Sequence, residues 1–174
     1  MPEKERRMAN IRRLIYGLAL IIAALIQNSV AFLPRLLNVK AVLLLPLVIG
    51  VAMQEFEIPA LFFGLLAGLL ADIFSAAPGG FNALLFTSFA FLVSALINTV
   101  MRNNIVTALL FNGLGLLIYF PTHWLFTVVL KAREGALAVF LTFHLPSALY
   151  TLLFFPMFYY FAGAVKRRTH IRAL

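Results

Sequence analysis

The stretch from Pro59 to Asp72 reads PALFFGLLAGLLAD and decides the fold class of this chain. It is a continuous run of apolar and small residues that closes on an acid. Asp72 is the only charged residue between Glu57 and Arg102. Placing a carboxylate inside a bilayer costs roughly 2.5 to 3.5 kcal/mol on insertion scales, so Asp72 requires a partner, a water-filled cavity or a function.

The composition around this stretch is that of a membrane protein. Hydrophobic residues make up 63% of the 174 residues and charged residues 11%, and the mean hydropathy is +1.01. Soluble domains contain about 45–50% apolar and about 25% charged residues. With about 20 residues for each crossing, residues 1–174 form a single all-α transmembrane domain with no length left for a soluble domain. The chain has no cysteine, which excludes disulfides, thiolate metal sites and cysteine nucleophiles.

Six apolar stretches predict a polytopic bundle of six transmembrane helices with short loops. The second stretch, 41–53, is the shortest and contains Pro46. As a helix it would rise about 20 Å against a hydrocarbon core of about 30 Å. It must therefore recruit flanking residues, thin the bilayer or be shielded inside the bundle. The predicted spans are 14–33, 41–53, 58–74, 81–100, 105–130 and 137–165.

The charge distribution predicts that both ends of the chain are cytoplasmic. The net charge is +8, and the basic residues gather in an N-terminal arm, 1–13, and a C-terminal tail, 166–174. At these positions they orient the chain in the bilayer, which is a simpler use than binding nucleic acid. The triplet Ser29-Val30-Ala31 also resembles a signal-peptide cleavage site, but the downstream spans favour an uncleaved first helix. With six spans the inside residues are Lys4, Arg6, Arg7, Arg12, Arg13, Arg102, Lys166, Arg167, Arg168 and Arg172, and the outside residues are Arg35, Lys40, Lys131 and Arg133.

The third predicted helix is expected to carry a face of small residues that ends at Asp72. Gly64, Gly68 and Asp72 lie at positions i, i+4 and i+8, and therefore share one side of the helix. Glycines at this spacing let another backbone approach closely, which is a main source of helix association in lipid. Packing inside the bundle and docking of a partner both remain open, with Asp72 as a capping or docking acid. The candidate residues are Gly64, Gly68, Asp72, Ser75, Gly79, Gly80 and Asn82.

His123 and His144 form a second candidate, an outer polar cluster. Measured from the inner ends of their helices, Asp72 lies at about 21 Å, His123 at about 27 Å and His144 at about 32 Å. Neither histidine has a second ligand at helical spacing, so a structural hydrogen bond or contact with water is favoured over a metal or catalytic site. The neighbouring Pro121 and Pro146 predict local breaks in the helices.

The remaining polar residues are expected to join helices or to meet solvent. Buried amides bond between membrane helices and contribute about 0.6 to 2 kcal/mol each. Glu55 and Glu57 are expected to meet the basic N-terminal arm, in a pair that solvent weakens. No Ser-His-Asp arrangement, phosphate-binding glycine loop, zincin helix or catalytic carboxylate pair can be assembled, so no enzyme and no cofactor are expected. The amides in predicted spans are Gln27, Asn28, Asn82, Asn98 and Asn112.

The segment GLLAGLLADIFS from Gly64 to Ser75, followed by PGGFNALL from Pro78 to Leu85, resembles the centre of the rod-shape-determining MreD family. The basic start, a first span that ends in polar residues, the short second span with proline and the basic tail match as well. The resemblance therefore covers nearly the whole chain, although the motif is mostly glycine and leucine. The turn departs slightly, because it carries Ala76-Ala77-Pro78 before Gly79.

This resemblance implies a non-enzymatic subunit of the bacterial cell-elongation machinery in the cytoplasmic membrane. Such a subunit maintains rod shape by pairing with the bitopic protein MreC. It works alongside MreB, the RodA glycosyltransferase and a class B penicillin-binding transpeptidase in peptidoglycan synthesis along the side wall.

An alternative is the substrate-binding component of an energy-coupling-factor vitamin transporter. These components are also bundles of six short-looped helices of about this length. Their first helix docks a partner through Ala-x-x-x-Ala, as Ala19 and Ala23 would here. A vitamin binder should bring several polar groups together in an outer cavity.

Overall fold

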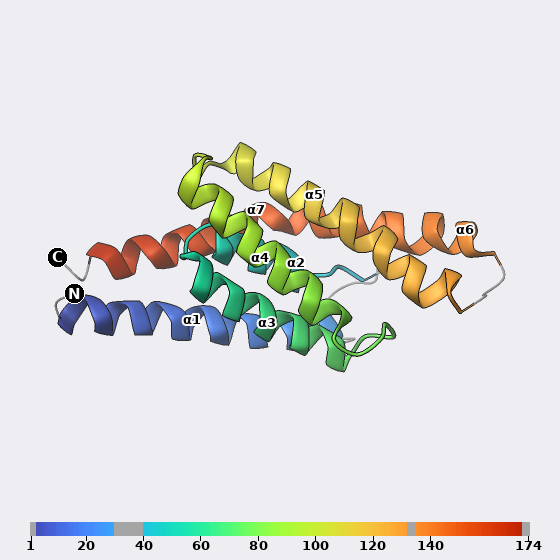
Figure 1. The fold of residues 1–174 in the computed structure, drawn as a ribbon, viewed down its shortest axis with the longest axis horizontal. Helices are drawn as coiled ribbons and strands as arrows, with labels where there is room; N and C mark the ends of the chain where they lie inside the picture. The colour runs from blue at the N-terminus through green and yellow to red at the C-terminus, as the bar shows by residue number, and fades with distance from the viewer. Residues whose placement is uncertain (1–2, 30–39, 132–134, 172–174) are drawn as a thin grey trace.

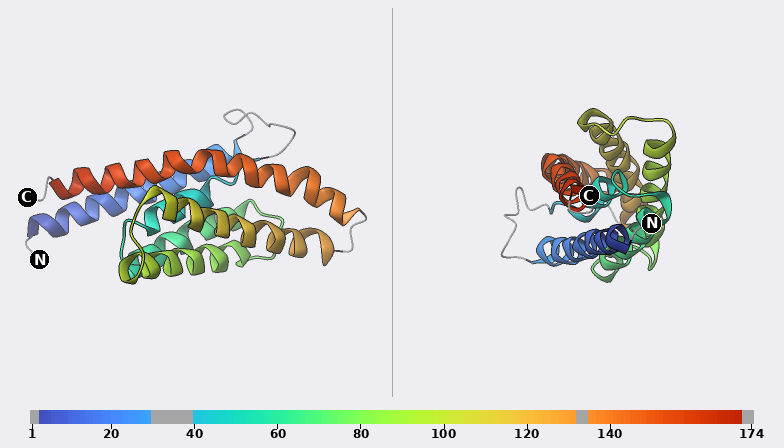
Figure 2. Two further views of the ribbon diagram at one scale, coloured as in Figure 1. Left: turned by 90° about the horizontal axis from the view of Figure 1, so that it is seen from above. Right: turned by 90° about the vertical axis from the view of Figure 1, so that its left-hand side faces the viewer.

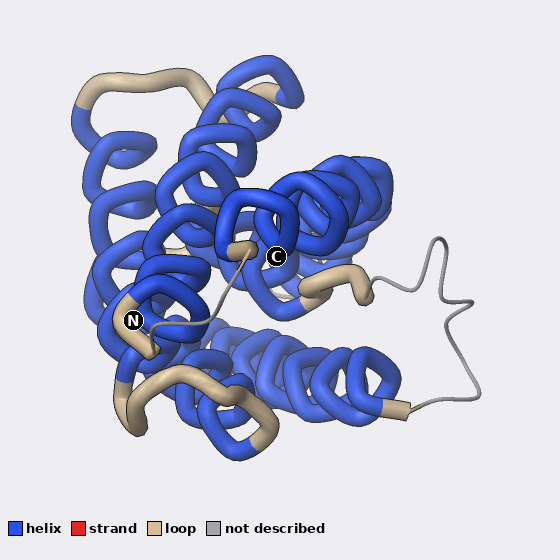
Figure 3. The backbone as a smooth tube through the Cα atoms, turned by 90° about the vertical axis from the view of Figure 1, so that its right-hand side faces the viewer, coloured by secondary structure: helices blue, strands red, loops and turns tan. Residues whose placement is uncertain are grey.

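The computed structural model describes residues 3–29, 40–131 and 135–171, and within these ranges the chain is helical with no strand (Figure 3). The all-α class predicted from the sequence is confirmed for this part of the chain. The predicted end of the first span, Val30 and Ala31 of the triplet, and Arg35 and Arg133 lie outside the described residues. The elements are α1 (Glu3–Asn28), α2 (Leu44–Ala52), α3 (Glu57–Ile73), α4 (Phe81–Thr99), α5 (Ile105–Trp124), the π-helical turn η2 (Leu125–Val129), α6 (Ala136–Val139), the π-helical turn η3 (Phe140–His144) and α7 (Leu145–Ile171).

The first and last helices frame the bundle. α1 and α7 contact each other, and the start of α1 lies at the same end of the molecule as the end of α7 (Figure 1). Both helices extend at that end beyond α3, α4 and α5 (Figure 2). The basic arm predicted at 1–13 is therefore helical from Glu3 onward and continues directly into the apolar part of α1.

The short helix α2 forms the centre of the bundle. All nine of its residues are buried, and α1, α3, α4, α5 and α7 all contact it. A helix of this length rises only about 14 Å. Of the three solutions open to the short second stretch, the structure adopts shielding inside the bundle.

Within the described residues, four helices are long and apolar enough to cross a membrane, and they cover Glu3–Asn28, Phe81–Thr99, Ile105–Val129 and Ala136–Thr169. This arrangement is compatible with a multi-pass membrane protein. α3 is shorter, with 17 residues that rise about 25 Å, and α2 is too short to cross by itself. The count of six spans consequently stays a prediction.

The irregular backbone that leads into α2 is hydrogen-bonded by side chains of neighbouring helices. The N–H of Val42 donates to Thr151 Oγ1 of α7 at 2.9 Å, and the N–H of Leu44 donates to Gln27 Oε1 of α1 at 3.2 Å. Irregular backbone at membrane depth is tolerated where protein groups satisfy it. Gln27 thus joins α1 to α2, as was expected of the amides in predicted spans. The same expectation was wrong for Asn28, which bonds to the carbonyl of Ala24 within α1, and for Asn112, whose amide has no partner among the described residues.

A buried ion pair ties α1 to the turn between α2 and α3. Arg12 binds both carboxylate oxygens of Glu55, and its Nη2 lies 3.1 Å from Glu55 Oε2. The Glu55 side chain is 0% exposed and the Arg12 side chain 17% exposed. The expected contact with the basic arm exists for Glu55, but the expectation that solvent weakens it was wrong for this buried carboxylate. The carboxylate of Glu57 instead accepts from Asn98 Nδ2 at 3.1 Å. The turn is packed against α1 and α4, and Ser94 Oγ of α4 donates to the Glu55 carbonyl at 2.8 Å.

We expect the two ends of this pair to be strongly coupled. Arg12→Met or Glu55→Leu alone should lower the free energy of unfolding by about 3 kcal/mol, because each leaves an uncompensated buried charge. The double variant should lose much less than the two single losses added together. Unfolding titrations in detergent of all four proteins measure the coupling, and additive losses would contradict a buried pair.

Candidate functional site

Asp72 lies at the junction of α3 and α4 and caps the first turn of α4. Its Oδ1 accepts from the backbone N–H of Asn82 at 3.0 Å and from Asn82 Nδ2 at 2.9 Å, and its Oδ2 accepts from the N–H of Ala83 at 3.0 Å. The formal N-cap residue of α4 is Gly80, which has no side chain to supply such bonds. The acid therefore replaces water for N–H groups that would otherwise lack partners and places negative charge at the positive end of the helix dipole.

The glycines on the same face of α3 allow this junction to form. A methyl group added at Gly64 would lie 2.5 Å from the carbonyl oxygen of Phe86, and one added at Gly68 would lie 2.5 Å from that of Asn82. Both distances are too short for a real contact, so only glycine permits α3 and α4 to approach this closely. These two helices form the most extensive pair of the bundle.

The turn between the two helices holds the remaining members of the predicted set. Gly80 adopts a positive φ of 85°, and the N–H of Phe81 donates to the carbonyl of Pro78 at 3.1 Å to close the turn. Ser75 Oγ accepts from the N–H of Ala77 at 3.1 Å, while Gly79 and Gly80 are exposed. The structure thus brings Gly64, Gly68, Asp72 and Asn82 together inside the bundle and leaves Ser75, Gly79 and Gly80 in the turn.

The sequence left two interpretations of the glycine face open, packing inside the bundle and docking of a partner, and this arrangement bears on both. α4 covers the face of Gly64, Gly68 and Asp72, so within one copy of the chain that face packs inside the bundle. Asp72 acts as a capping acid toward α4. A partner has access to the exposed turn and not to the glycine face.

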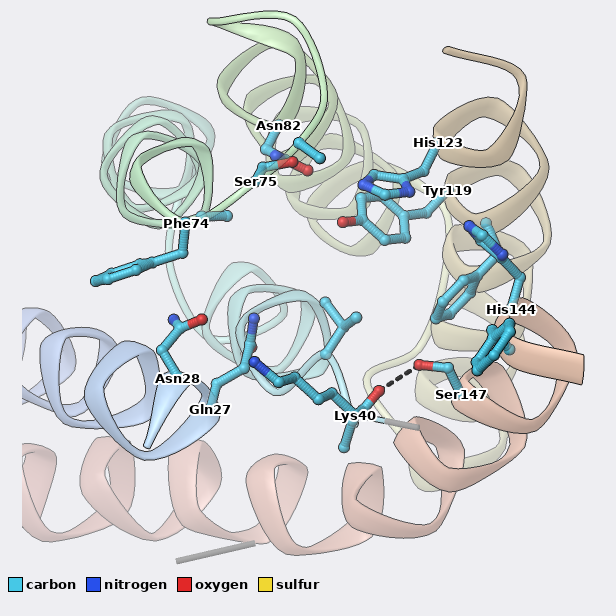
Figure 4. Close-up of a pocket in the computed structure, with 16 residues that line it drawn as sticks. Gln27, Asn28, Lys40, Phe74, Ser75, Asn82, Tyr119, His123, His144 and Ser147 are labelled. Atoms are coloured by element: carbon cyan, nitrogen blue, oxygen red, sulfur yellow. Dashed lines mark hydrogen bonds between the residues drawn. The ribbon is translucent and has the colours of Figure 1, made fainter. Parts of the chain in front are cut away.

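The end of the bundle opposite the chain termini contains a cavity of about 310 Å³, which we call the polar cavity (Figure 4). Its walls come from α1, α3, α4, α5, α7 and η3, and the segment that precedes α2 forms another part. Amides, imidazoles, hydroxyls and one ammonium group share this space with aromatic rings. The lining residues are Gln27, Asn28, Lys40, Ala41, Val42, Ala71, Phe74, Ser75, Ala76, Asn82, Tyr119, Phe120, His123, Phe143, His144 and Ser147.

The two predicted histidines meet in this cavity, with their ring centroids 5.7 Å apart. His123 also lies 5.6 Å from the ring centroid of Tyr119, and His144 lies 6.2 Å from that of Phe120. Within the described ranges no group of three His, Cys, Asp or Glu side chains is placed to hold a metal ion. The carboxylate of Asp72 is engaged by α4, so the pair supplies two imidazoles without a third ligand.

The predicted helix breaks beside the histidines do not occur. The chain stays helical through Pro121 and Pro146 and widens instead into η2 and η3. Pro146 has no N–H to donate to the carbonyl of Thr142, and the wider turn of η3 carries the helix past this gap. His144 is the last residue of η3, so the wider turn helps to set where its ring points.

Sequence reasoning missed Lys40, Tyr119 and Ser147 as members of this site. Ser147 Oγ donates to the carbonyl of Lys40, which fixes the segment before α2 against α7. Ser147 and Thr151 are spaced i, i+4 on α7, and both bond this segment. That spacing of hydroxyls on one face of an apolar helix is the signal that would have located the contact.

Comparisons with known proteins add no further assignment. No family model, no curated protein and no solved structure matches this chain.

The close approach of α3 and α4 predicts a strong difference between glycines. Gly68→Ala should lower the free energy of unfolding by about 1–3 kcal/mol, because its methyl group has no space against α4. Gly113→Ala is the matched control, since a methyl group at that helical position meets nothing within 4 Å. Thermal unfolding in detergent measures both, and equal melting temperatures would show that the junction tolerates a side chain.

Because Asp72 caps α4, substitutions at Asp72 should destabilise the protein by different amounts. Asp72→Ala removes all three hydrogen bonds and should destabilise the protein by about 2 kcal/mol, whereas Asp72→Asn keeps one acceptor and should lose less. Gly79→Ala tests the adjacent turn, where the added methyl group meets nothing within 4 Å, and should change little. Unfolding titrations of the three variants decide the order, and a stable Asp72→Ala protein would contradict the capping role.

Proposed function

We propose that this chain is a non-enzymatic membrane subunit of the bacterial cell-elongation machinery, similar to MreD. In this proposal it maintains rod shape by binding an MreC-like bitopic protein and supports peptidoglycan synthesis along the side wall together with MreB, RodA and a class B penicillin-binding transpeptidase. It lies in the cytoplasmic membrane with both ends cytoplasmic. Its six crossings include α3, and also α2 together with the segment that leads into it.

The α3–α4 junction is the observation that carries the proposal. The sequence segment that resembles the MreD family contains Gly64, Gly68, Asp72 and Asn82, and these residues form the junction. The type of each of these residues explains its physical role in the junction. We therefore infer that proteins that share this motif also share the helix pair. Fold-level likeness does not fix function, and the binding of a partner requires its own site.

The arrangement of the ends supports the proposed topology. The start of α1 and the end of α7 lie together at one end of the bundle (Figure 2), as an even number of crossings requires. The basic side chains of both helices gather at that end, where the positive-inside rule places the cytoplasm. Shielding of α2 by five helices supports its inclusion as a short inner crossing.

An apolar groove between α1 and α7 is the proposed docking site for the partner helix. Its volume is about 380 Å³, and among the described residues no polar or charged side chain lines it. Ile22 is 54% exposed and Met157 57% exposed on its walls, while α2 lies beneath. A single apolar helix, such as the membrane anchor of a bitopic protein, matches a groove with these walls. The lining residues are Ala19, Ile22, Ala23, Ile26, Leu43, Leu47, Phe154, Met157, Phe158 and Phe161.

Filling the groove should release the partner without unfolding the bundle. Ile22→Trp places a bulky ring on the exposed wall and should reduce recovery of an MreC-like protein about tenfold, which corresponds to about 1.4 kcal/mol. Ile21→Trp is the matched control, because Ile21 is the neighbouring exposed isoleucine and does not line the groove. Asp72 variants are less suitable here, since they alter the fold itself.

Affinity purification of the tagged chain from gently solubilised membranes measures this recovery. Equal recovery with Ile22→Trp and Ile21→Trp would contradict the groove as the docking site. Absence of any wall-synthesis partner from the wild-type eluate would contradict the proposed function.

The polar cavity favours a second candidate function. Convergent polar groups in an outer cavity are expected of the substrate-binding component of an energy-coupling-factor transporter, and the polar cavity has this character. Ala19 and Ala23, which line the apolar groove, would then dock the transmembrane partner of that transporter. Recovery of a transporter ATPase module in the same purification would favour this function over cell elongation.

A further inference from the structure

We infer that the polar cavity binds a small organic anion that carries an aromatic ring and, at the far side from its negative group, an N–H or O–H donor. Three features of the cavity support this ligand class: a positive side, an aromatic wall and an unpaired acceptor. The inference does not depend on which protein partner binds the chain.

The positive side of the polar cavity comes from Lys40. Lys40 extends its side chain toward Gln27 along this side of the cavity (Figure 4). Ala41 and Val42 line the cavity, whereas the carbonyl of Met53 at the other end of α2 bonds to Asn103. The segment that leads into α2 therefore lies at the cavity, but Thr151 and Gln27 bond the N–H groups of Val42 and Leu44, so Lys40 supplies the positive charge on this side.

No carboxylate in the described part of the wall opposes an anion. Asp72 is not a lining residue, and α4 hydrogen-bonds both of its oxygens. A further basic residue, Lys131, donates to the carbonyl of Ala76 at 2.9 Å, and Ala76 lines the cavity. The two lysines, Lys40 in the wall and Lys131 beside it, thus favour an anion over a cation.

Opposite Lys40, Asn82 presents an acceptor without a partner (Figure 4). Asn82 is 0% exposed, and its Nδ2 donates to Asp72, which fixes the orientation of the amide. Its Oδ1 is left with no hydrogen-bond partner among the described residues. A buried acceptor in this state is unfavourable, and a ligand donor would satisfy it. The hydroxyl of Tyr119 also lines the cavity beside it.

Aromatic side chains supply the remaining surface. Tyr119, His123 and His144 lie on one side of the cavity, and Phe74 lies across from them (Figure 4). Ligand sites are lined mainly by apolar and aromatic groups with a few placed polar groups, and about 310 Å³ is at the lower end of their usual volumes. A single ring with two polar substituents has the size and the surface that this wall accepts. The rings are those of Phe74, Tyr119, Phe120, Phe143, His123 and His144.

Three simple ring compounds test the two polar ends separately. The full chain in phosphatidylcholine nanodiscs is titrated with 4-aminobenzoate, which has both groups, with benzoate, which lacks the donor, and with aniline, which lacks the anion. The wild-type protein should bind 4-aminobenzoate about tenfold more tightly than either other compound, the effect of one well-placed hydrogen bond or charge. Calorimetry or ligand-observed NMR measures the affinities.

Two variants assign the contacts to residues. Lys40→Met should bind 4-aminobenzoate no more tightly than aniline. Asn82→Ala should bind 4-aminobenzoate no more tightly than benzoate. Lys40 is exposed, so its variant tests the site without disturbing the core. Asn112→Ala is the matched control, because Asn112 is also a fully buried asparagine but does not line the cavity, and it should bind like the wild type.

Each result of these titrations supports or overturns the inference. No binding of 4-aminobenzoate, equal affinity for the three compounds, or an unchanged preference in Lys40→Met overturns the inference. Loss of binding when phosphatidylglycerol replaces phosphatidylcholine assigns the site to an anionic lipid headgroup and overturns the assignment to a soluble ring compound. Recovery of a wall-synthesis partner is measured independently, so failure here leaves the proposed function standing.

Discussion

The carboxylate of Asp72 binds the first free N–H groups of α4, and the approach of α3 to α4 depends on that contact. Without the two glycines below it the helices would stand further apart, and the acid would not reach its partners. The same contact orients the amide of Asn82, a residue that lines the polar cavity. One buried acid consequently determines a helix pair, a turn and one wall of a cavity.

A second constraint is the requirement that backbone groups in a bilayer find partners inside the protein. α2 is too short to cross alone, and irregular backbone precedes it. Polar side chains at Gln27 and Thr151 bond that backbone, while Arg12 and Glu55 fix the opposite end of the helix. Polar groups that appear dispersed along an apolar sequence are thus concentrated around one short central helix.

The two proposed binding surfaces differ in chemistry because they lie on different parts of this architecture. The groove between α1 and α7 has only apolar walls and suits a membrane helix. The polar cavity lies at the end of the bundle opposite the chain termini (Figure 1), between the segment that precedes α2 and the α3–α4 junction. A protein with both surfaces can bind a partner along its side and a small molecule at its end.

The amino-acid sequence by itself determined the all-helical class, apolar helices compatible with a membrane protein, most helix boundaries and the shared face of Gly64, Gly68 and Asp72, because these depend on local hydropathy and spacing. It also placed His123 and His144 at similar depth. It did not determine that the Arg12–Glu55 pair is buried or that Lys40 joins the histidines, since both depend on how distant segments fold over α2. Only the tertiary structure decided that α4 covers the glycine face and that Asp72 caps it, because a close-packing face has the same pattern whether its partner is the next helix or another protein.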